Sequence, residues 1–252
     1  MPIIPLLRRY LIESQLFVSL MGTLLAVFFM LEQNAFRFPT VILIFITFLS
    51  GYLYTKYQGN KKKMKTVLLF NTLAFVICAV LILKNHNEIR LLKWLVIVVL
   101  GLLYNSNFLS KTVRSLPLVK IFYVGLVWAL ICGWLFLEEL HWGIFLFTWL
   151  FISSLVIPFD IRDLRLDRVL TLPGLIGIEK SKYVSYFLFF LSLLVAYFYF
   201  SGPYFYSLTL ALLLGAVAVY FSSEKRKEPY YSFWVELTSG VPFLFLAILD
   251  YF

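Results

Sequence analysis

Nine apolar segments, each long enough to cross a membrane, dominate this sequence and leave few folds open to it. Hydrophobic residues make up 62% of the 252-residue chain and charged residues only 14%, and the mean hydropathy is +0.91. A soluble domain of this length has too little interior to bury so much apolar surface. The segments lie near residues 12–31, 39–57, 66–84, 91–108, 117–137, 143–159, 181–200, 203–222 and 231–251.

The chemistry of the backbone decides what these segments become. Hydrocarbon cannot hydrogen-bond N–H and C=O groups, so a span must be a helix or part of a closed barrel. The segments are continuously apolar and do not alternate with a period of two, which favours helices. We therefore predict an all-α, polytopic membrane protein with nine transmembrane helices, and a single transmembrane domain over residues 1–252.

The distribution of basic residues predicts the orientation of the bundle. When the loops are taken alternately from the N-terminus, one set holds 18 of the 22 Lys and Arg residues and the other holds four. The positive-inside rule assigns the first set to the cytoplasm, which puts the N-terminus inside and the C-terminus outside. We expect a bacterial inner (cell) membrane. The net charge of +9 then reflects topology and attraction to anionic membrane lipids, and we expect no nucleic-acid partner.

Three of the four aspartates in the chain lie within eight residues of each other, in the run IPFDIRDLRLDR: Asp160, Asp163 and Asp167. On a helix, this spacing puts the three carboxylates within about 60° of one another. Clustered carboxylates repel unless a cation neutralises them, and oxygen ligands suit Mg²⁺, which usually holds phosphates as well. The alternative is a solvated surface loop in which Asp and Arg side chains form ion pairs.

A nine-helix bundle with an aspartate cluster at the cytoplasmic end of its sixth helix resembles the UbiA superfamily of intramembrane prenyltransferases. DIRDLRLDR at 160–168 matches the D-x-x-D-x-x-x-D form of that family's second acidic motif, and TLPGLIG at 171–177 resembles its continuation. The segment 102–130 resembles the exit of the family's fourth helix, with Tyr104, a basic loop, and then Lys120 and Trp128. The resemblance covers essentially the whole chain.

This resemblance implies an enzyme that moves an isoprenoid chain from its diphosphate to a lipid-soluble, often aromatic, acceptor. It implies Mg²⁺ as cofactor, held by the three aspartates, with prenyl diphosphate as a partner. The implied diphosphate-binding residues are Lys56, Lys111, Arg114, Lys120 and Arg162. The implied cavity residues are Tyr54, Asn71, Tyr104 and Glu236. For Glu236, a structural role with a buried partner such as Asn71 is the alternative.

The first acidic motif of the family has no counterpart here. The corresponding stretch, SGYLYTKYQGNKKKMK at 50–65, has no acidic residue and five lysines. Either these lysines bind phosphate oxygens directly, or the corner has lost its role and the lysines only set topology. The chain is accordingly an active, divergent prenyltransferase or a catalytically silent relative that binds isoprenoid lipid or scaffolds membrane enzymes. A small transporter is disfavoured, because the glycines show no inverted repeat.

Overall fold

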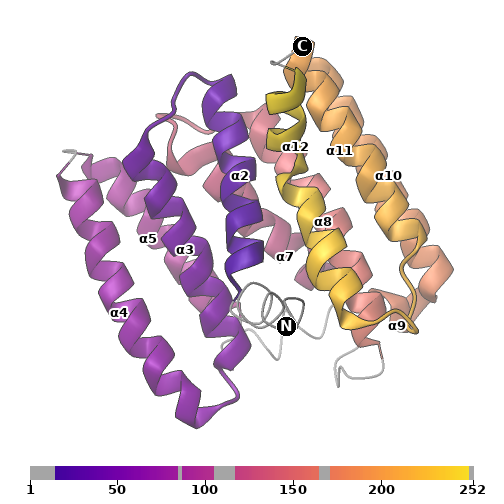
Figure 1. Ribbon diagram of the computed structural model, residues 1–252, viewed down its shortest axis with the longest axis horizontal. Helices are drawn as coiled ribbons and strands as arrows, with labels where there is room; N and C mark the ends of the chain where they lie inside the picture. The colour runs from indigo at the N-terminus through magenta and orange to yellow at the C-terminus, as the bar shows by residue number, and fades with distance from the viewer. Residues whose placement is uncertain (1–14, 85–86, 105–116, 165–170, 250–252) are drawn as a thin grey trace, which may run out of the picture.

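Each of the nine predicted segments contains a helix in the structure, a computed structural model that describes residues 15–84, 87–104, 117–164 and 171–249. The elements in chain order are α2 (Leu16–Glu32), α3 (Phe38–Tyr57), α4 (Lys61–Leu83), α5 (Glu88–Leu103), α7 (Pro117–Leu130), η2 (Ile131–Leu135), α8 (Trp142–Asp163), α9 (Leu172–Ile176), α10 (Ile178–Tyr199), α11 (Gly202–Tyr220), η3 (Tyr230–Val235) and α12 (Glu236–Leu249). The short π-helical element η2 continues α7, and a second one, η3, leads into α12. Figure 1 shows how the helices are arranged. The predicted all-α class is confirmed, since every regular element in the described ranges is helical.

In the part of the chain that the structure describes, six helical segments are long and apolar enough to cross a membrane: α3, α4, α8, α10, α11 and Tyr230–Leu249, which comprises η3 and α12. They indicate an integral membrane protein. The segments Leu16–Glu32 and Val119–Leu135 are apolar but shorter, and α5 has 16 residues. A helix of that length rises about 24 Å, less than a hydrocarbon core of about 30 Å. The count of nine spans therefore stays a prediction.

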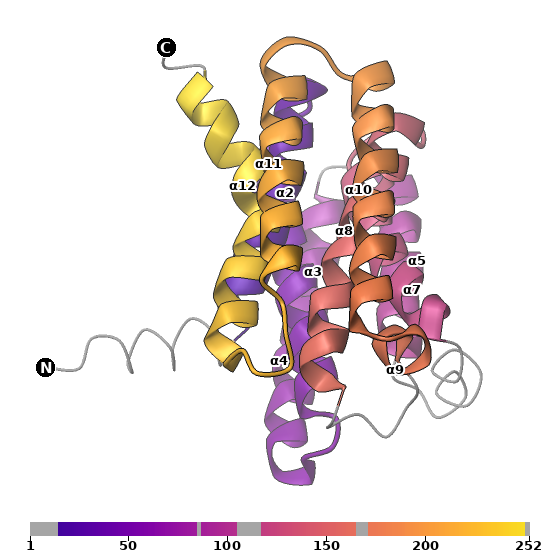
Figure 2. The ribbon, with the colours of Figure 1, turned by 90° about the vertical axis from the view of Figure 1, so that its right-hand side faces the viewer.

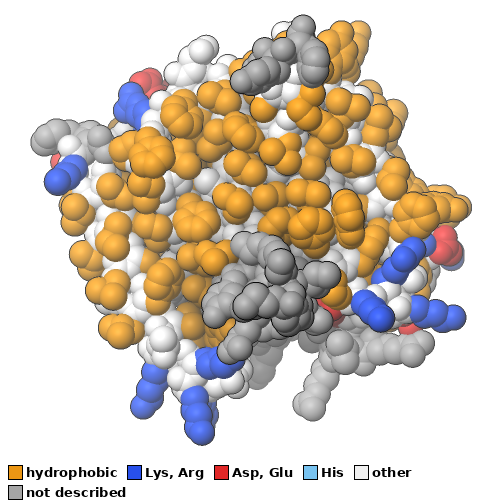
Figure 3. All heavy atoms as spheres, in the orientation of Figure 1, with side chains coloured by type: hydrophobic (Ala, Val, Ile, Leu, Met, Phe, Trp, Pro, Cys, Tyr) orange, Lys and Arg blue, Asp and Glu red, His pale blue; other side chains and the backbone are white. Residues whose placement is uncertain are grey.

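The surface of the molecule suits a lipid environment. Apolar side chains cover most of the face shown in Figure 3, and Lys and Arg side chains lie at its margins. The helix α4 is an example, because it packs mainly against α3 and exposes a long series of apolar residues that includes Leu69, Leu73 and Ile77. In water such a surface would drive association, whereas in a membrane it contacts acyl chains.

Local sequence fixes where two of the outer helices begin. The Asn60 side chain accepts a hydrogen bond from the backbone N–H of Lys63 at 3.2 Å, which caps α4. The Asn87 side chain accepts one from the backbone N–H of Arg90 at 2.9 Å, which caps α5. Asparagine is among the best capping residues, because its oxygen satisfies an N–H that the helix itself cannot pair.

The helix α8 is the most buried span and packs against α7 and α10. It contains Pro158, which has no N–H to donate to the carbonyl of Ser154 one turn earlier. The Ser185 hydroxyl of α10 donates to that carbonyl instead, at 2.8 Å. The proline is thus tolerated inside the bundle because a neighbouring helix supplies the missing donor.

A glycine allows α7 and α8 to approach closely. A Cβ atom on Gly125 of α7 would lie 2.6 Å from the backbone oxygen of Trp149 in α8, and it would also meet the side chain of Ser153. Since no real Cβ occupies such a position, any larger residue would force the two helices apart. Lys120, which also contacts α8, lies about one and a half turns before this close contact on α7.

Two basic side chains of α5 hold the end of the α7–η2 segment. The Arg90 guanidinium donates to the carbonyl of Phe136 at 3.4 Å, and the Lys93 ammonium donates to the carbonyls of Leu137 and Glu138, both at 2.8 Å. Carbonyls at a helix C-terminus have no partner within the helix, so cations stabilise them. Arg90 and Lys93 are two of the four basic residues in the loops that the charge rule places outside the cytoplasm, and both therefore have a structural role.

The connections divide between the two ends of the bundle. The α3–α4 and α11–α12 connections, the C-terminal end of α8 and the short helix α9 lie at one end, at the bottom of Figures 1 and 2. The α2–α3 and α10–α11 connections lie at the other. The first end is the one for which the charge rule predicts the cytoplasm.

Cysteine labelling tests this orientation. We expect single cysteines introduced by Lys61→Cys and Arg226→Cys to react with a membrane-impermeant maleimide only after the cytoplasmic face is exposed. Glu88→Cys and Glu139→Cys should react in intact cells. All four positions are exposed, and both native cysteines are buried, so background labelling should be low. A reversed pattern would invert the predicted orientation.

Candidate functional site

The C-terminal end of α8 places a carboxylate inside the protein. The Asp160 side chain is 1% exposed, and its Oδ1 lies 2.7 Å from the Lys120 ammonium of α7. Burying a carboxylate is costly unless a cation and hydrogen bonds compensate it, so such pairs inside a bundle are commonly functional. The alternative of a fully solvated loop does not describe Asp160.

One turn later, Asp163 is held by its neighbour. The Arg162 Nε and Nη2 atoms donate to the two carboxylate oxygens of Asp163, each at 2.7 Å. The Arg162 guanidinium also lies over the rings of Phe159 and Tyr231, at 5.3 and 5.8 Å from their centroids. A bidentate pair with two aromatic contacts fixes the position of this cation more firmly than a surface ion pair would.

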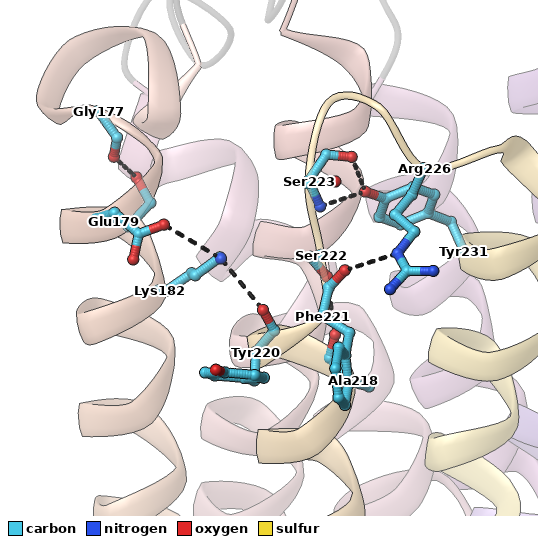
Figure 4. A network of polar contacts seen from close by, with 11 residues as sticks. Gly177, Glu179, Lys182, Ala218, Tyr220, Phe221, Ser222, Ser223, Arg226 and Tyr231 are labelled. Carbon is cyan, nitrogen blue, oxygen red and sulfur yellow. Dashed lines mark hydrogen bonds and ion pairs between the residues drawn. The ribbon is translucent and has the colours of Figure 1, made fainter.

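Hydrogen bonds to the α11–α12 connection fix the position of Tyr231, whose ring lies against the Arg162 guanidinium. The Tyr231 ring is fully buried, and its hydroxyl donates to the Ser223 carbonyl at 2.7 Å and accepts from the Ser223 N–H at 3.0 Å (Figure 4). The same connection carries Arg226, whose Nε donates to the Phe221 carbonyl at 3.2 Å. These bonds connect η3, which leads into α12, to the end of α11. They therefore fix the Tyr231 ring that contacts Arg162.

Glu236, at the start of α12, belongs to this charged end of the bundle. Its carboxylate interacts electrostatically with Arg162, Lys56 and Glu228. Glu236 was suggested as a cavity residue from the sequence, but it is not among the residues that line the apolar cavity between α3, α4, α5 and α7. The alternative of Asn71 as its partner receives no support either, because the Asn71 amide donates to the Ser50 carbonyl at 3.3 Å. We call Lys120, Asp160, Arg162, Asp163 and Glu236 the charged cluster.

The lysines of the α3–α4 corner are exposed. Lys56, in the last turn of α3, is the one that interacts with Glu236 of the charged cluster. The ammonium groups of Lys56 and Lys63 both lie over the Tyr57 ring, 5.9 and 5.0 Å from its centroid, so both contact their own corner. Lys56 differs from Lys63 in that its charge also acts on Glu236.

Three of the predicted site residues, Asp167, Lys111 and Arg114, lie outside the described residues. Within the described ranges, no group of three His, Cys, Asp or Glu side chains could hold a metal ion. Asp160 and Asp163 offer the oxygen atoms that Mg²⁺ prefers, yet each is bound by a cation from the protein. Binding of Mg²⁺ would therefore require a second anion that pairs with Lys120 and Arg162 in place of the two aspartates.

An apolar cavity of about 540 Å³ opens between α3, α4, α5 and α7. Tyr54, Asn71 and Tyr104, three of the four predicted cavity residues, line it. Volumes of this size are typical of sites for small organic ligands. The remaining lining is largely aliphatic and aromatic, and it includes Tyr52 and Trp128.

Tyr52 and Trp128 are hydrogen-bonded to each other in the cavity wall, and the sequence did not single out Tyr52. The Trp128 indole N–H donates to the Tyr52 hydroxyl at 3.1 Å, and the charge of Glu236 acts on Tyr52. Helical spacing gives no signal for Tyr52, because the polar stripe of Thr47, Ser50 and Tyr54 lies about 140–160° away from it around α3.

Comparison of the chain with protein-family models, with curated protein sequences and with solved structures finds no match in any of the three.

Proposed function

We propose that the chain is an intramembrane prenyltransferase that moves an isoprenoid chain from its diphosphate to a lipid-soluble acceptor. The proposal keeps the nine-helix UbiA-like bundle that the sequence resembles, with α2, α5 and α7–η2 as further spans. The observation that carries it is that one bundle contains an apolar cavity of about 540 Å³ and, at the end of α8, a cluster of cations and carboxylates with the buried Lys120–Asp160 pair. A substrate with a hydrocarbon tail and a polyanionic head needs both environments.

The cations of the cluster suit a diphosphate. Lys120 and Arg162 neutralise Asp160 and Asp163 in the structure, and phosphate oxygens would compete for the same donors. In the proposal, the diphosphate is bound by Lys120, Arg162 and Lys56, and also by Lys111 and Arg114. Asp160 and Asp163, together with Asp167, would hold Mg²⁺, which would supply positive charge to stabilise the departing diphosphate.

The cavity suits the rest of the reaction. Cleavage of an allylic C–O bond leaves a carbocation that water would quench, so the reacting carbon needs a dry, apolar site. The aromatic rings that line the cavity offer their faces to such a cation, as tyrosine and tryptophan do for other cations. In the proposal, the tail lies in this cavity between α3 and α5, with Tyr52 and Trp128 in its wall.

A second function is favoured by a specific observation. The α3–α4 corner carries lysines in place of the family's first acidic motif, and each described aspartate of α8 already has a cationic partner. A protein that only binds isoprenoid lipid, or that scaffolds membrane enzymes, needs no second metal site. A lipid-binding or scaffolding role predicts that the lysines of the α3–α4 corner affect only the membrane topology.

Binding of a prenyl diphosphate to two lysine variants separates the two functions. Lys56→Gln should weaken binding of a labelled farnesyl diphosphate by roughly three- to tenfold, because an exposed lysine contributes part of a charge-assisted hydrogen bond. Lys62→Gln is the matched control, and it should change affinity less than about twofold at moderate salt, where exposed charges are screened. Equal and negligible effects of both changes would favour the lipid-binding role.

A further inference from the structure

Two buried polar atoms in the cavity have no hydrogen-bond partner among the residues that the structure describes: Ser50 Oγ and Asn71 Oδ1. They lie close together across the α3–α4 contact, because the Asn71 amide nitrogen donates to the Ser50 backbone carbonyl at 3.3 Å. Buried polar atoms are rarely left without a partner, since each then loses its bonds to water and gains none. The pair therefore marks a place where a ligand group belongs.

Other polar groups of the cavity wall are already satisfied within the protein. Thr47 Oγ1 accepts from the Trp94 indole N–H at 2.9 Å, and Thr72 Oγ1 donates to the Leu68 carbonyl at 2.9 Å. The Tyr123 hydroxyl donates to a backbone carbonyl of α5 at 2.6 Å. The contrast with Ser50 and Asn71 is informative, because hydroxyls on the same wall do find partners.

We propose that this cavity binds a neutral lipid through one hydroxyl group, which donates to Asn71 Oδ1 and accepts from the Ser50 hydroxyl. A hydroxyl is the smallest group that satisfies both atoms at once, since it carries one donor and two acceptor lone pairs. The ligand is neutral because no charged side chain belongs to the described cavity wall. It is a lipid because the rest of that wall is mainly apolar and lies within the membrane-spanning helices α3 and α4.

The position of the site gives this ligand a role. Ser50 precedes Lys56 by six residues on α3, a rise of about 9 Å along the helix. A hydroxyl held there lies deeper in the membrane than Lys56, in the cavity that the isoprenoid tail would occupy. The inference rests on the proposed function only in naming this lipid as the acceptor; the binding itself needs neither a diphosphate nor Mg²⁺.

The test uses the two tryptophans of the cavity, Trp94 and Trp128, as reporters. Purified protein in lipid nanodiscs is titrated with a dibrominated octadecanol, whose bromines quench tryptophan fluorescence, and in parallel with its methyl ether, which has no donor. We expect saturable quenching with roughly tenfold tighter binding of the alcohol, as expected for one lost hydrogen bond to a buried acceptor. The preference should disappear in Asn71→Leu and in the smaller change Ser50→Ala.

Thr72→Val is the control, because it removes a hydroxyl of the same wall that is already bonded to a backbone carbonyl. It should keep the preference for the alcohol. Equal binding of alcohol and ether to the unchanged protein would overturn the proposal, and so would an unaltered preference in Ser50→Ala. Loss of prenyl transfer in a separate assay would leave this binding result intact, so the two failures can be told apart.

Discussion

Lys120→Met is expected to lower the free energy of unfolding by roughly 2–4 kcal/mol, because it removes the ammonium that compensates the buried Asp160 carboxylate at 2.7 Å. Breaking a fully buried pair usually costs somewhat more, but the Lys120 side chain is 23% exposed and retains some contact with solvent. Thermal unfolding of the purified protein in detergent measures the effect. Lys180→Met, at an exposed position near the same end of the bundle, should change stability little.

A double variant separates the pair from a simple loss of packing. Replacing Lys120 with Met and Asp160 with Leu together should restore most of the lost stability, since the costly buried charge is then gone. If Lys120→Met alone is as stable as the unchanged protein, Asp160 does not depend on this pair and the structural basis of the charged cluster fails.

Arg162→Met should reduce the affinity for a non-hydrolysable farnesyl thiodiphosphate by about ten- to a hundredfold, the loss expected for a charge-assisted hydrogen bond worth roughly 1.5–3 kcal/mol. Arg162 is the cation that interacts with both Asp163 and Glu236, so no other described side chain of the cluster can replace its two donors. Arg162→Lys should lose less, because it keeps the charge but not the planar pair of donors. Radioligand binding to purified protein measures the series.

Arg226→Met is the matched control for this series. Arg226 also lies over an aromatic ring, 5.4 Å from the Tyr230 centroid. Its Nε donates to the Phe221 carbonyl (Figure 4), but Arg226 belongs to the exposed α11–α12 connection. Its replacement should leave diphosphate affinity within about twofold, because screened surface charges contribute little. A similar loss in both variants would show that net positive charge, and not the cluster, governs binding.

The helices were predictable from the sequence because hydrocarbon leaves the backbone no alternative. Each predicted segment contains a helix, and most limits agree within a few residues, as in 143–159 against Trp142–Asp163. The count of spans was less secure. The segment 91–108 includes the charged residue Lys93 near one end, and the helix there, α5, is only 16 residues long.

The charged cluster was only partly predictable. Spacing placed Asp160 and Asp163 on one side of α8, and one helical turn does separate them. Their partners could not be read from spacing, because Lys120 reaches Asp160 across 40 positions of sequence and only the packing of α7 against α8 brings the two together. For Glu236 the sequence suggested a cavity residue; it is not among the residues that line the cavity, and its charge interacts with those of Arg162 and Lys56.

The cavity was predicted through three of its residues, and its binding chemistry was not. A polar residue in an apolar helix signals a partner or a ligand, but the sequence does not tell which. Thr72 and Asn71 are neighbours in sequence, yet the Thr72 hydroxyl bonds to its own helix while Asn71 Oδ1 finds no partner within the described residues. Only the packing of α4 against α3 distinguishes them.

The proposed transfer reaction itself is tested most directly by incubating the purified protein with a radiolabelled prenyl diphosphate, Mg²⁺ and a membrane lipid extract. The account predicts a new labelled, organic-soluble product together with released inorganic diphosphate. Both should require Mg²⁺ and should be lost in Asp163→Asn, which removes a charged ligand at nearly constant size, while membrane insertion stays normal. If chains of several lengths give no product, or if product forms equally well in Asp163→Asn, the assignment of catalysis to this end of α8 is wrong.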